Sequence, residues 1–86
     1  MMEQVSMTFG EALEAMKNGK KVARTGWNGK GMYLYLADGK LLTQEIGDGS
    51  YPFTDSVVMK TADNRYCIGW LASQTDMLAE DWHIVE

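Results

Sequence analysis

The stretch MYLYLADG, residues 32–39, is the part of the sequence that decides the fold. Aromatic and aliphatic side chains alternate over residues 32–37, which predicts a strand that is covered on both faces. The dipeptide Asp38-Gly39 that follows is a strong hairpin signal. We therefore expect an antiparallel sheet in which residues 41–46 form the partner of this strand.

Similar turn signals continue on both sides of this stretch. Asn-Gly or Asp-Gly dipeptides also begin at residues 18, 28 and 48 and cut the chain into pieces of about ten residues, the spacing of an antiparallel meander. The pieces with β-compatible composition are residues 20–26, 56–61, 65–71 and 81–85. We expect Val22 to face the core, Lys21 and Ala23 to face away, and residues 47–55 to form the longest loop.

Two short helices are predicted by capping boxes, in which a Ser or Thr is followed three residues later by an acidic residue. Thr8 with Glu11 opens the first helix, and Asn18-Gly19 ends it after a run of apolar residues at helical spacing. Ser73 with Asp76 opens the second helix. The sequence therefore predicts an α+β domain, a small antiparallel sheet of about five or six strands with two short helices.

Composition and size exclude several classes of protein. The 86 residues fit a single domain spanning residues 1–86. The net charge of −4 disfavours a nucleic-acid polymer as partner, because binding to a phosphate backbone needs clustered Lys and Arg. One cysteine, Cys67, and one histidine, His83, cannot form a zinc site or a disulfide framework within the chain, and we expect both to be buried structural residues. Without a long apolar run or a signal peptide, we expect a cytoplasmic protein with no membrane association, metal or cofactor.

The charge is distributed unevenly along the chain. Residues 17–30 contain five basic residues and no acidic one, whereas residues 66–86 contain four acids and no Lys or Arg. A local cationic stretch in an acidic protein suits a small anionic ligand. The alternative is a solvated strand beside a helix whose carboxyl end favours cations.

Residues 24–30, RTGWNGK, combine side chains that suit a nucleotide. The Arg24 guanidinium forms bidentate bonds to phosphate, Trp27 offers a flat face to a purine, and the Asn28 amide suits a base edge or a sugar hydroxyl. The alternative is a turn whose tryptophan fills the small core.

A second candidate region, WLASQTDMLAEDW at residues 70–82, contains the amino end of the second predicted helix. Ser73, Thr75 and Asp76 suit contacts with ribose hydroxyls there, although Asp76 also serves as a capping residue. Asp76 and Glu80 are four residues apart on one predicted helix face and are a candidate carboxylate pair for a hydrolytic enzyme; the alternative is a solvated helix face. Nothing in these residues demands an enzyme.

Four segments together resemble one family: residues 8–13, 22–32, 57–62 and 70–82. The family is the small phage and prophage domain called Thoeris anti-defence 2. The resemblance implies a protein that binds the cyclic ADP-ribose signal of a bacterial Thoeris TIR-domain protein and holds it intact, so that the downstream effector stays inactive. It also implies a homotetramer with ligand pockets between subunits and, in some relatives, separate sites for cyclic di- or trinucleotides.

Carried over onto matching positions, the resemblance implies six ligand-binding residues and no catalytic or metal-binding one. These six are Phe9 and Trp27 as apolar walls around a base, Arg24 and Asn28 as polar contacts from one turn, and Thr75 and Asp76 as partners of ribose or phosphate. Residues 63–69 fall outside the match.

The sequence therefore predicts a cytoplasmic, homo-oligomeric protein that sequesters a cyclic nucleotide signal without degrading it. Two rival functions stay open. One is a small enzyme that hydrolyses the same class of signal with Asp76 or Glu80. The other is a protein-interaction module, in which the surplus of methionine and aromatic side chains forms a partner surface.

Overall fold

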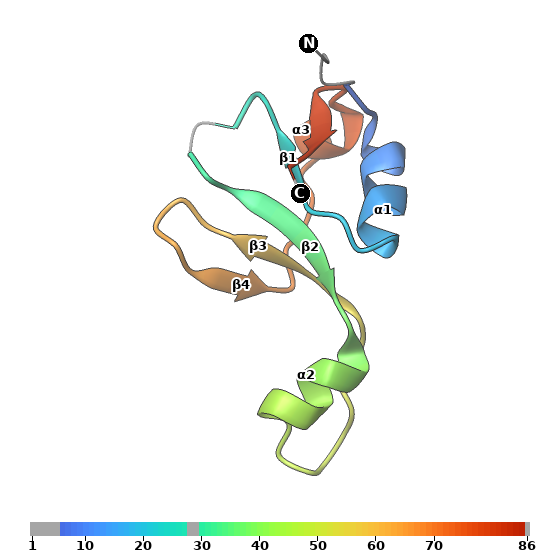
Figure 1. Ribbon diagram of the computed structural model, residues 1–86, viewed down its shortest axis with the longest axis vertical. Coiled ribbons are helices and arrows are strands. Elements are labelled where there is room, and N and C mark those ends of the chain that lie inside the picture. Colours follow the sequence, from blue (N-terminus) through green and yellow to red (C-terminus); the bar gives the residue numbers. More distant parts are fainter. Residues whose placement is uncertain (1–5, 28–29, 86) are drawn as a thin grey trace.

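The computed structural model describes residues 6–27 and 30–85, which form a five-stranded antiparallel sheet and three helices (Figure 1). The strands lie side by side in the order β4-β3-β2-β1-β5. In chain order the elements are α1 (Phe9–Lys17), β1 (Val22–Arg24), β2 (Tyr33–Ala37), α2 (Gly39–Ile46), β3 (Ser56–Lys60), β4 (Tyr66–Ile68), α3 (Gln74–Leu78) and β5 (Trp82–Ile84). The predicted α+β class is confirmed, with three helices where two were predicted.

The hydrophobic core lies between α1 and one face of the sheet. Its buried residues come from α1, β1, β2 and β5: Ala12, Met16, Val22, Leu34 and Trp82. Trp82 is the largest of them and is fully buried. The predicted capping box opens α1, since the Glu11 amide donates to the Thr8 hydroxyl at 3.2 Å and the Thr8 amide donates to the Glu11 carboxylate at 2.9 Å. This cap fixes where α1 begins and therefore which side chains it turns toward the sheet.

Residues 41–46, predicted as a strand, belong to helix α2 instead. Asp38 caps this helix, because its carboxylate accepts a hydrogen bond from the Lys40 amide at 2.7 Å. The dipeptide Asp38-Gly39 therefore starts a helix and does not turn a hairpin. The antiparallel partner of β2 is β3, which follows the predicted loop 47–55 and pairs with all five residues of β2.

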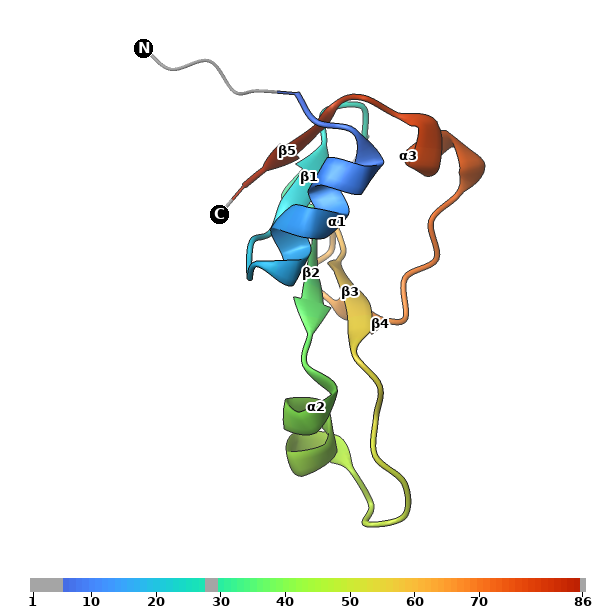
Figure 2. The same ribbon diagram turned by 90° about the vertical axis from the view of Figure 1, so that its right-hand side faces the viewer.

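Helix α2 and the loop after it, residues 39–55, are here called the arm. In both views the arm lies at the opposite end of the molecule from α1 and α3 (Figure 2). The molecule is accordingly elongated, with dimensions of 47 × 28 × 26 Å. Gly39 is the one buried residue of α2, whereas Leu41 and Ile46 are 58% and 54% exposed. The arm therefore presents apolar side chains to solvent.

The sheet face opposite α1 carries tyrosines and is called the tyrosine face. Because side chains alternate along a strand, Tyr33 and Tyr35 point away from the face that buries Leu34. The register of β2, β3 and β4 places Lys60 between Tyr33 and Tyr66. The hydroxyls of Tyr33 and Tyr66 lie 3.4 Å apart.

Strand β1 is buried on both faces. Val22 faces the core as predicted and is fully buried, but Ala23, predicted to face away, is only 6% exposed. The reason is that β1 lies between β2 and β5, so neighbouring side chains cover the small Ala23 on the tyrosine face as well. Among the helices of residues 6–27 and 30–85, none is long and apolar enough to cross a membrane.

Candidate functional site

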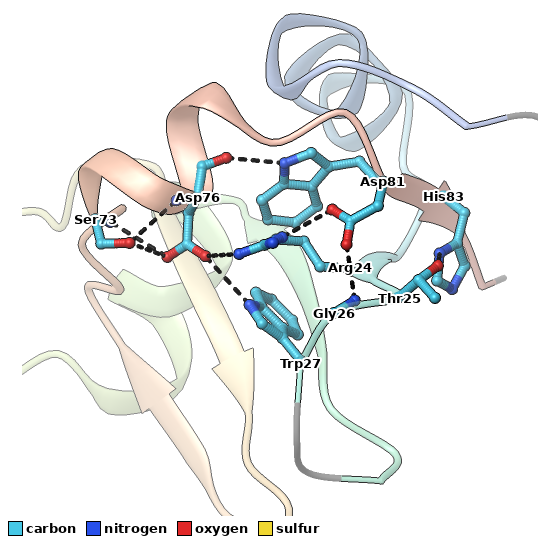
Figure 3. A network of polar contacts seen from close by, with 9 residues as sticks. Arg24, Thr25, Gly26, Trp27, Ser73, Asp76, Asp81 and His83 are labelled. Carbon is cyan, nitrogen blue, oxygen red and sulfur yellow. Dashed lines mark hydrogen bonds and ion pairs between the residues drawn. The ribbon is translucent and has the colours of Figure 1, made fainter.

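A network of polar contacts joins the turn after β1 to α3 and to the start of β5 (Figure 3). Arg24, the last residue of β1, lies at its centre. The Arg24 Nε donates to Asp81 Oδ1 at 2.8 Å, and the Arg24 Nη1 donates to Asp76 Oδ1 at 2.9 Å. The side chains of Arg24 and Asp76 are each 14% exposed, so these charge-assisted bonds are largely shielded from water.

All three charged groups are held in their ionised forms. Hydrogen bonds to Asp81 and then to Asp76 raise the pKa of Arg24 above its ordinary value. The bond from Arg24 is the main cause of the lowered pKa of Asp81. Burial opposes ionisation of Asp76, but its hydrogen bonds, that from Arg24 foremost, outweigh burial and lower its pKa as well. One cation therefore faces two carboxylates, and the cluster is negative at neutral pH.

Asp76 ties α3 to the turn. Its Oδ2 accepts from the Ser73 amide at 3.2 Å and from the Ser73 hydroxyl at 2.9 Å, which confirms the predicted capping box. Its Oδ1 accepts from the Trp27 indole N–H at 3.2 Å in addition to Arg24. Its backbone carbonyl accepts from the Trp82 indole N–H at 3.0 Å. Asp76 therefore both caps α3 and links this helix to Arg24 and Trp27.

Asp81 holds the turn itself. Its Oδ2 accepts from the Gly26 amide at 2.7 Å, and its backbone carbonyl accepts from the Thr25 amide at 3.1 Å. The Thr25 hydroxyl lies 3.4 Å from His83 Nδ1. Together with the bond from Arg24, these contacts attach three consecutive residues of the turn to the carboxyl-terminal segment.

Four aromatic rings pack beside the polar network: Phe9, Trp27, Trp70 and Trp82. The rings of Trp27 and Trp82 meet edge to face, with centroids 5.3 Å apart and planes at 80°. Phe9 packs against Trp82 at 5.4 Å, and Trp70 lies 6.3 Å from Trp27. These arrangements are ones that aromatic pairs prefer. Trp27 is half-buried, so part of its indole remains accessible to a ligand.

A shallow groove of about 460 Å³ lies beside the turn and is lined by parts of β1, β2 and β5. Trp27 and Tyr33 give it aromatic surface, while Arg24, Thr25 and His83 give it polar groups. Its volume lies within the range of small-molecule sites, and an apolar lining with a few polar groups is typical of them.

Two lysines lie next to the Tyr33 ring of this groove. The ammonium nitrogens of Lys21 and Lys60 are 4.9 Å and 6.0 Å from the ring centroid. Lys60 also donates to the Gly31 carbonyl at 2.9 Å. Within the described residues, neither lysine forms an ion pair with a carboxylate. The groove therefore has positive charge at its border in a protein whose net charge is −4.

Of the six predicted binding residues, the structure brings four together: Phe9, Arg24, Trp27 and Asp76. Arg24 and Asp76 bond to each other, so their predicted contacts with a ligand stay predictions. Thr75 is exposed on α3, and no hydrogen bond within the described residues joins its side chain to the network. Asn28 lies outside the described residues.

Asp81, Trp70 and Trp82 lie in the second candidate region, residues 70–82, but none of them is among the six predicted binding residues. One signal for Asp81 exists in the charge pattern. Arg24 lies in a basic stretch without an acid, so a half-buried guanidinium there needs a carboxylate from a distant segment. Residues 66–86 contain four acids and no Lys or Arg, so this segment is the natural source of that carboxylate.

The catalytic candidates do not come together. Cys67 and His83 lie on β4 and β5, the two opposite edges of the sheet. Cys67 is exposed and not buried as predicted, because edge strand β4 lies outside the area that α1 covers. Helix α3 ends at Leu78, so Glu80 does not share a helix face with Asp76. In the part of the chain that the structure describes, no group of three His, Cys, Asp or Glu residues is placed to hold a metal ion.

Comparison with known proteins identifies relatives of the whole domain. The family model described as "Thoeris anti-defense 2-like domain" matches residues 7–85, which include the turn after β1, α3 and β5. The protein named "Thoeris anti-defense 2" of Bacillus phage SP01 is 47% identical over 88 residues, covering 95% of this chain and 98% of the phage protein. These matches confirm the resemblance seen in the sequence and support a phage anti-defence role. The chain belongs to the Thoeris anti-defence 2-like family.

Proposed function

We propose that this protein binds a cyclic ADP-ribose-type signal, holds it intact and thereby keeps the Thoeris effector inactive. It would act in the cytosol of the infected bacterium, where the signal is made. One observation carries the proposal: a member of an anti-defence family has an aromatic groove bordered by two lysines that form no ion pair with a carboxylate of the described residues.

The groove offers a partner for each part of such a ligand, which has an adenine base, ribose hydroxyls and a pyrophosphate. The Trp27 ring suits the base, since base–aromatic stacking contributes about 1–3 kcal/mol. Thr25 and His83 suit the ribose hydroxyls. Lys21 and Lys60, which have no carboxylate partner within the described residues, suit the pyrophosphate.

The other residues implied by the family have supporting roles in the proposal. Phe9 supports the aromatic cluster behind Trp27. Arg24, which lines the groove, meets the ligand with the edge of its guanidinium that Asp76 and Asp81 leave open, and Asp76 holds that guanidinium in place. Asn28 and Thr75 are the proposed contacts for a base edge and a ribose hydroxyl.

The state of the nearby carboxylates supports a non-enzymatic role. Asp76 and Asp81 are bonded to Arg24, and the pKa of each is lowered, so neither serves as a proton donor near neutral pH. Glu80, the other carboxylate of the rival hydrolase, is exposed beyond the end of α3. Holding the signal requires no catalytic group, metal or cofactor.

We also infer a homo-oligomer, namely a tetramer. Tight sequestration needs a dry pocket, and a shallow groove becomes one when a second subunit covers it. Exposed apolar side chains supply surface for subunits to bury: Leu41 and Ile46 on the arm, and Tyr66 and Ile68 on β4. For the cyclic di- or trinucleotides that some relatives are expected to hold, we propose a site separate from this groove.

Equilibrium titration with a panel of cyclic ADP-ribose isomers and cyclic dinucleotides tests this proposal. We expect tight binding of at least one isomer. Lys21→Gln should weaken binding about fivefold or more by removing a cation from the groove border, while Lys40→Gln, a matched change on the exposed arm, should not. A folded protein that binds none of these nucleotides would contradict the proposal. It would favour the protein-interaction module, for which the apolar side chains of the arm are the supporting observation.

A further inference from the structure

We propose that Asp81 is a positioning residue, which holds residues 24–27 in their ligand-binding shape before a ligand arrives. The inference rests on the proposed function, because the same turn borders the groove. It assigns a role to a residue that is not among the six implied binding residues. The role is to order the binding turn, not to contact the ligand.

The carboxylate and the backbone carbonyl of Asp81 together fix the turn of residues 24–27. The Asp81 carboxylate uses one oxygen for the Arg24 Nε at 2.8 Å and the other for the Gly26 amide at 2.7 Å. The Asp81 carbonyl accepts from the Thr25 amide at 3.1 Å. Figure 3 shows the carboxylate between the guanidinium and the Gly26 backbone. With Nε held by Asp81 and Nη1 held by Asp76, the plane of the Arg24 guanidinium is set.

Asp81 is suited to this role because its own position is fixed. The next residue, Trp82, is fully buried and lies opposite Arg24 in the pairing of β1 with β5. The backbone of Trp82 also exchanges two hydrogen bonds with Met7, at 2.7 Å and 3.1 Å. The turn, in contrast, contains Gly26, a residue with unusual conformational freedom. Asp81 therefore connects a glycine-containing turn to the buried core.

The packing at Gly26 leaves no room for a side chain. A Cβ atom at this position would lie 2.9 Å from Asp81 Oδ2 and 3.2 Å from the Arg24 Nη2. The absence of a side chain thus permits the short contact between the amide and the carboxylate. Gly26→Ala would push the carboxylate away without changing the charge, so it breaks the same contact by a second route.

This contact should matter more for binding than for folding. The Asp81 side chain is 33% exposed and lies outside the buried core beneath α1. A turn that must be ordered during binding subtracts its ordering cost from the affinity, whereas a turn ordered in advance does not. Loss of the carboxylate should therefore loosen the turn while the core stays intact.

Amide hydrogen exchange of the free protein tests the role without any ligand. In Asp81→Asn, the Gly26 amide should exchange about tenfold faster, because it loses a hydrogen bond to a charged acceptor, and exchange of the core amide of Leu34 should change much less. Glu80→Gln is the matched control, since it removes the same charge from an exposed neighbouring residue. Unchanged exchange at Gly26, or equal acceleration at Leu34, would overturn the proposal.

Ligand titration of the same variants tests the consequence for binding. Asp81→Asn and Gly26→Ala should each weaken the affinity about tenfold, and the double variant should lose less than the product, because both changes break one contact. Wild-type affinity in Asp81→Asn would overturn the inference. A wild-type protein that binds no nucleotide would overturn the proposed function, and the exchange measurement would still decide the role of Asp81. If Asp81→Asn does not fold, Gly26→Ala carries both measurements.

Discussion

Asp76 is a largely buried carboxylate that is tolerated because both of its oxygens are fully engaged. It accepts hydrogen bonds from Ser73 on one side and from Arg24 and Trp27 on the other. A buried charge is costly unless it is paired and hydrogen-bonded, and removal of one partner leaves the others unsatisfied. The free energy of folding should therefore depend on the ionisation of Asp76 and of its neighbour Asp81.

The first prediction concerns pH. The pKa values of Asp76 and Asp81 are lowered in the folded protein below the ordinary value of 3.8, so the unfolded chain binds protons more readily at acid pH. The ionised carboxylates therefore stabilise the fold at pH values above 3.8. This contribution is lost as the pH falls through the pKa values that the two groups have in the folded protein. Asp76→Asn should lower the free energy of unfolding by about 1–3 kcal/mol near neutral pH and by much less at acid pH.

Urea unfolding of the wild type and of Asp76→Asn at about pH 7 and about pH 3 measures this difference. Glu14→Gln is the control, because the Glu14 side chain is 71% exposed in its ion pair with Lys17 and should change the free energy little. If Asp76→Asn lowered the free energy of unfolding equally at both pH values, the ionised form of Asp76 would not be the source of the stabilisation.

The second prediction concerns Trp27. Trp27→Ala should weaken ligand binding by about 1–3 kcal/mol through loss of stacking, whereas Trp27→Phe should keep most of the affinity and lose only the hydrogen bond to Asp76. Tyr51→Ala, at an 85% exposed position on the arm, is the aromatic control. Calorimetric titration of the three folded variants measures the effect. Full affinity in Trp27→Ala would show that the base does not lie on this ring.

The residues of the site were predictable in part. Arg24, Trp27 and Asp76 were expected from their chemistry and from the family, and they do meet in the structure. Asp81 was not expected, because its contact with Arg24 joins residues 57 positions apart and depends on the pairing of β1 with β5. A single sequence gives no strand pairing, so it gives no such contact.

At the scale of elements, the two predicted capping boxes marked α1 and α3 correctly, but the start of α2 was read as a hairpin. Asp-Gly is a signal for a tight turn and also an acceptable helix start, so the dipeptide alone does not decide. Contacts from the following loop decide it: Asp55 accepts from the Gly39 amide at 2.8 Å, and the Thr43 hydroxyl accepts from the Phe53 amide at 2.8 Å. Each pair is separated by ten or more residues along the chain, so no local sequence pattern predicts these contacts.

The third prediction tests this element. A Cβ atom at Gly39 would clash with the Phe53 carbonyl oxygen and lie 2.7 Å from the Thr54 carbonyl carbon, both of them backbone atoms that cannot move aside. Gly39→Ala should therefore destabilise the protein by about 1–3 kcal/mol and loosen the arm.

Thermal and urea unfolding measure this cost, with Gly10→Ala in α1 as the control. A Cβ atom at Gly10 would meet nothing closer than the Thr8 hydroxyl at 3.9 Å, so alanine there should be neutral or stabilise by up to about 1 kcal/mol. Equal stability of the two variants would contradict the packing of the arm.

At the scale of the whole molecule, the chain leaves much apolar surface uncovered. Leu41, Ile46, Tyr66 and Ile68 are 58%, 54%, 64% and 48% exposed, and all four border one groove between α2 and the tyrosine face. A domain of this size buries a modest share of its surface by itself. Assembly of several copies would cover these side chains.

The fourth prediction is that this surface holds the oligomer together. Leu41→Lys combined with Ile46→Lys should shift the protein from the proposed tetramer to smaller species, because a charge does not stay buried without a partner. Gln44→Lys, an added charge at an exposed position of the same helix, should not. Sedimentation velocity measures the masses. A wild type that is monomeric at every concentration, or a double variant that stays tetrameric, would contradict the prediction.

The most direct test of sequestration is to recover the ligand after binding. The protein would be saturated with the cyclic ADP-ribose isomer selected by the titration, incubated for hours and denatured by heat. The released molecule would then be analysed by mass spectrometry and by chromatography against the original isomer. We predict quantitative recovery of the unchanged signal. Release of a hydrolysed or opened product would show that the protein is an enzyme, and it would contradict the proposal that it holds the signal intact.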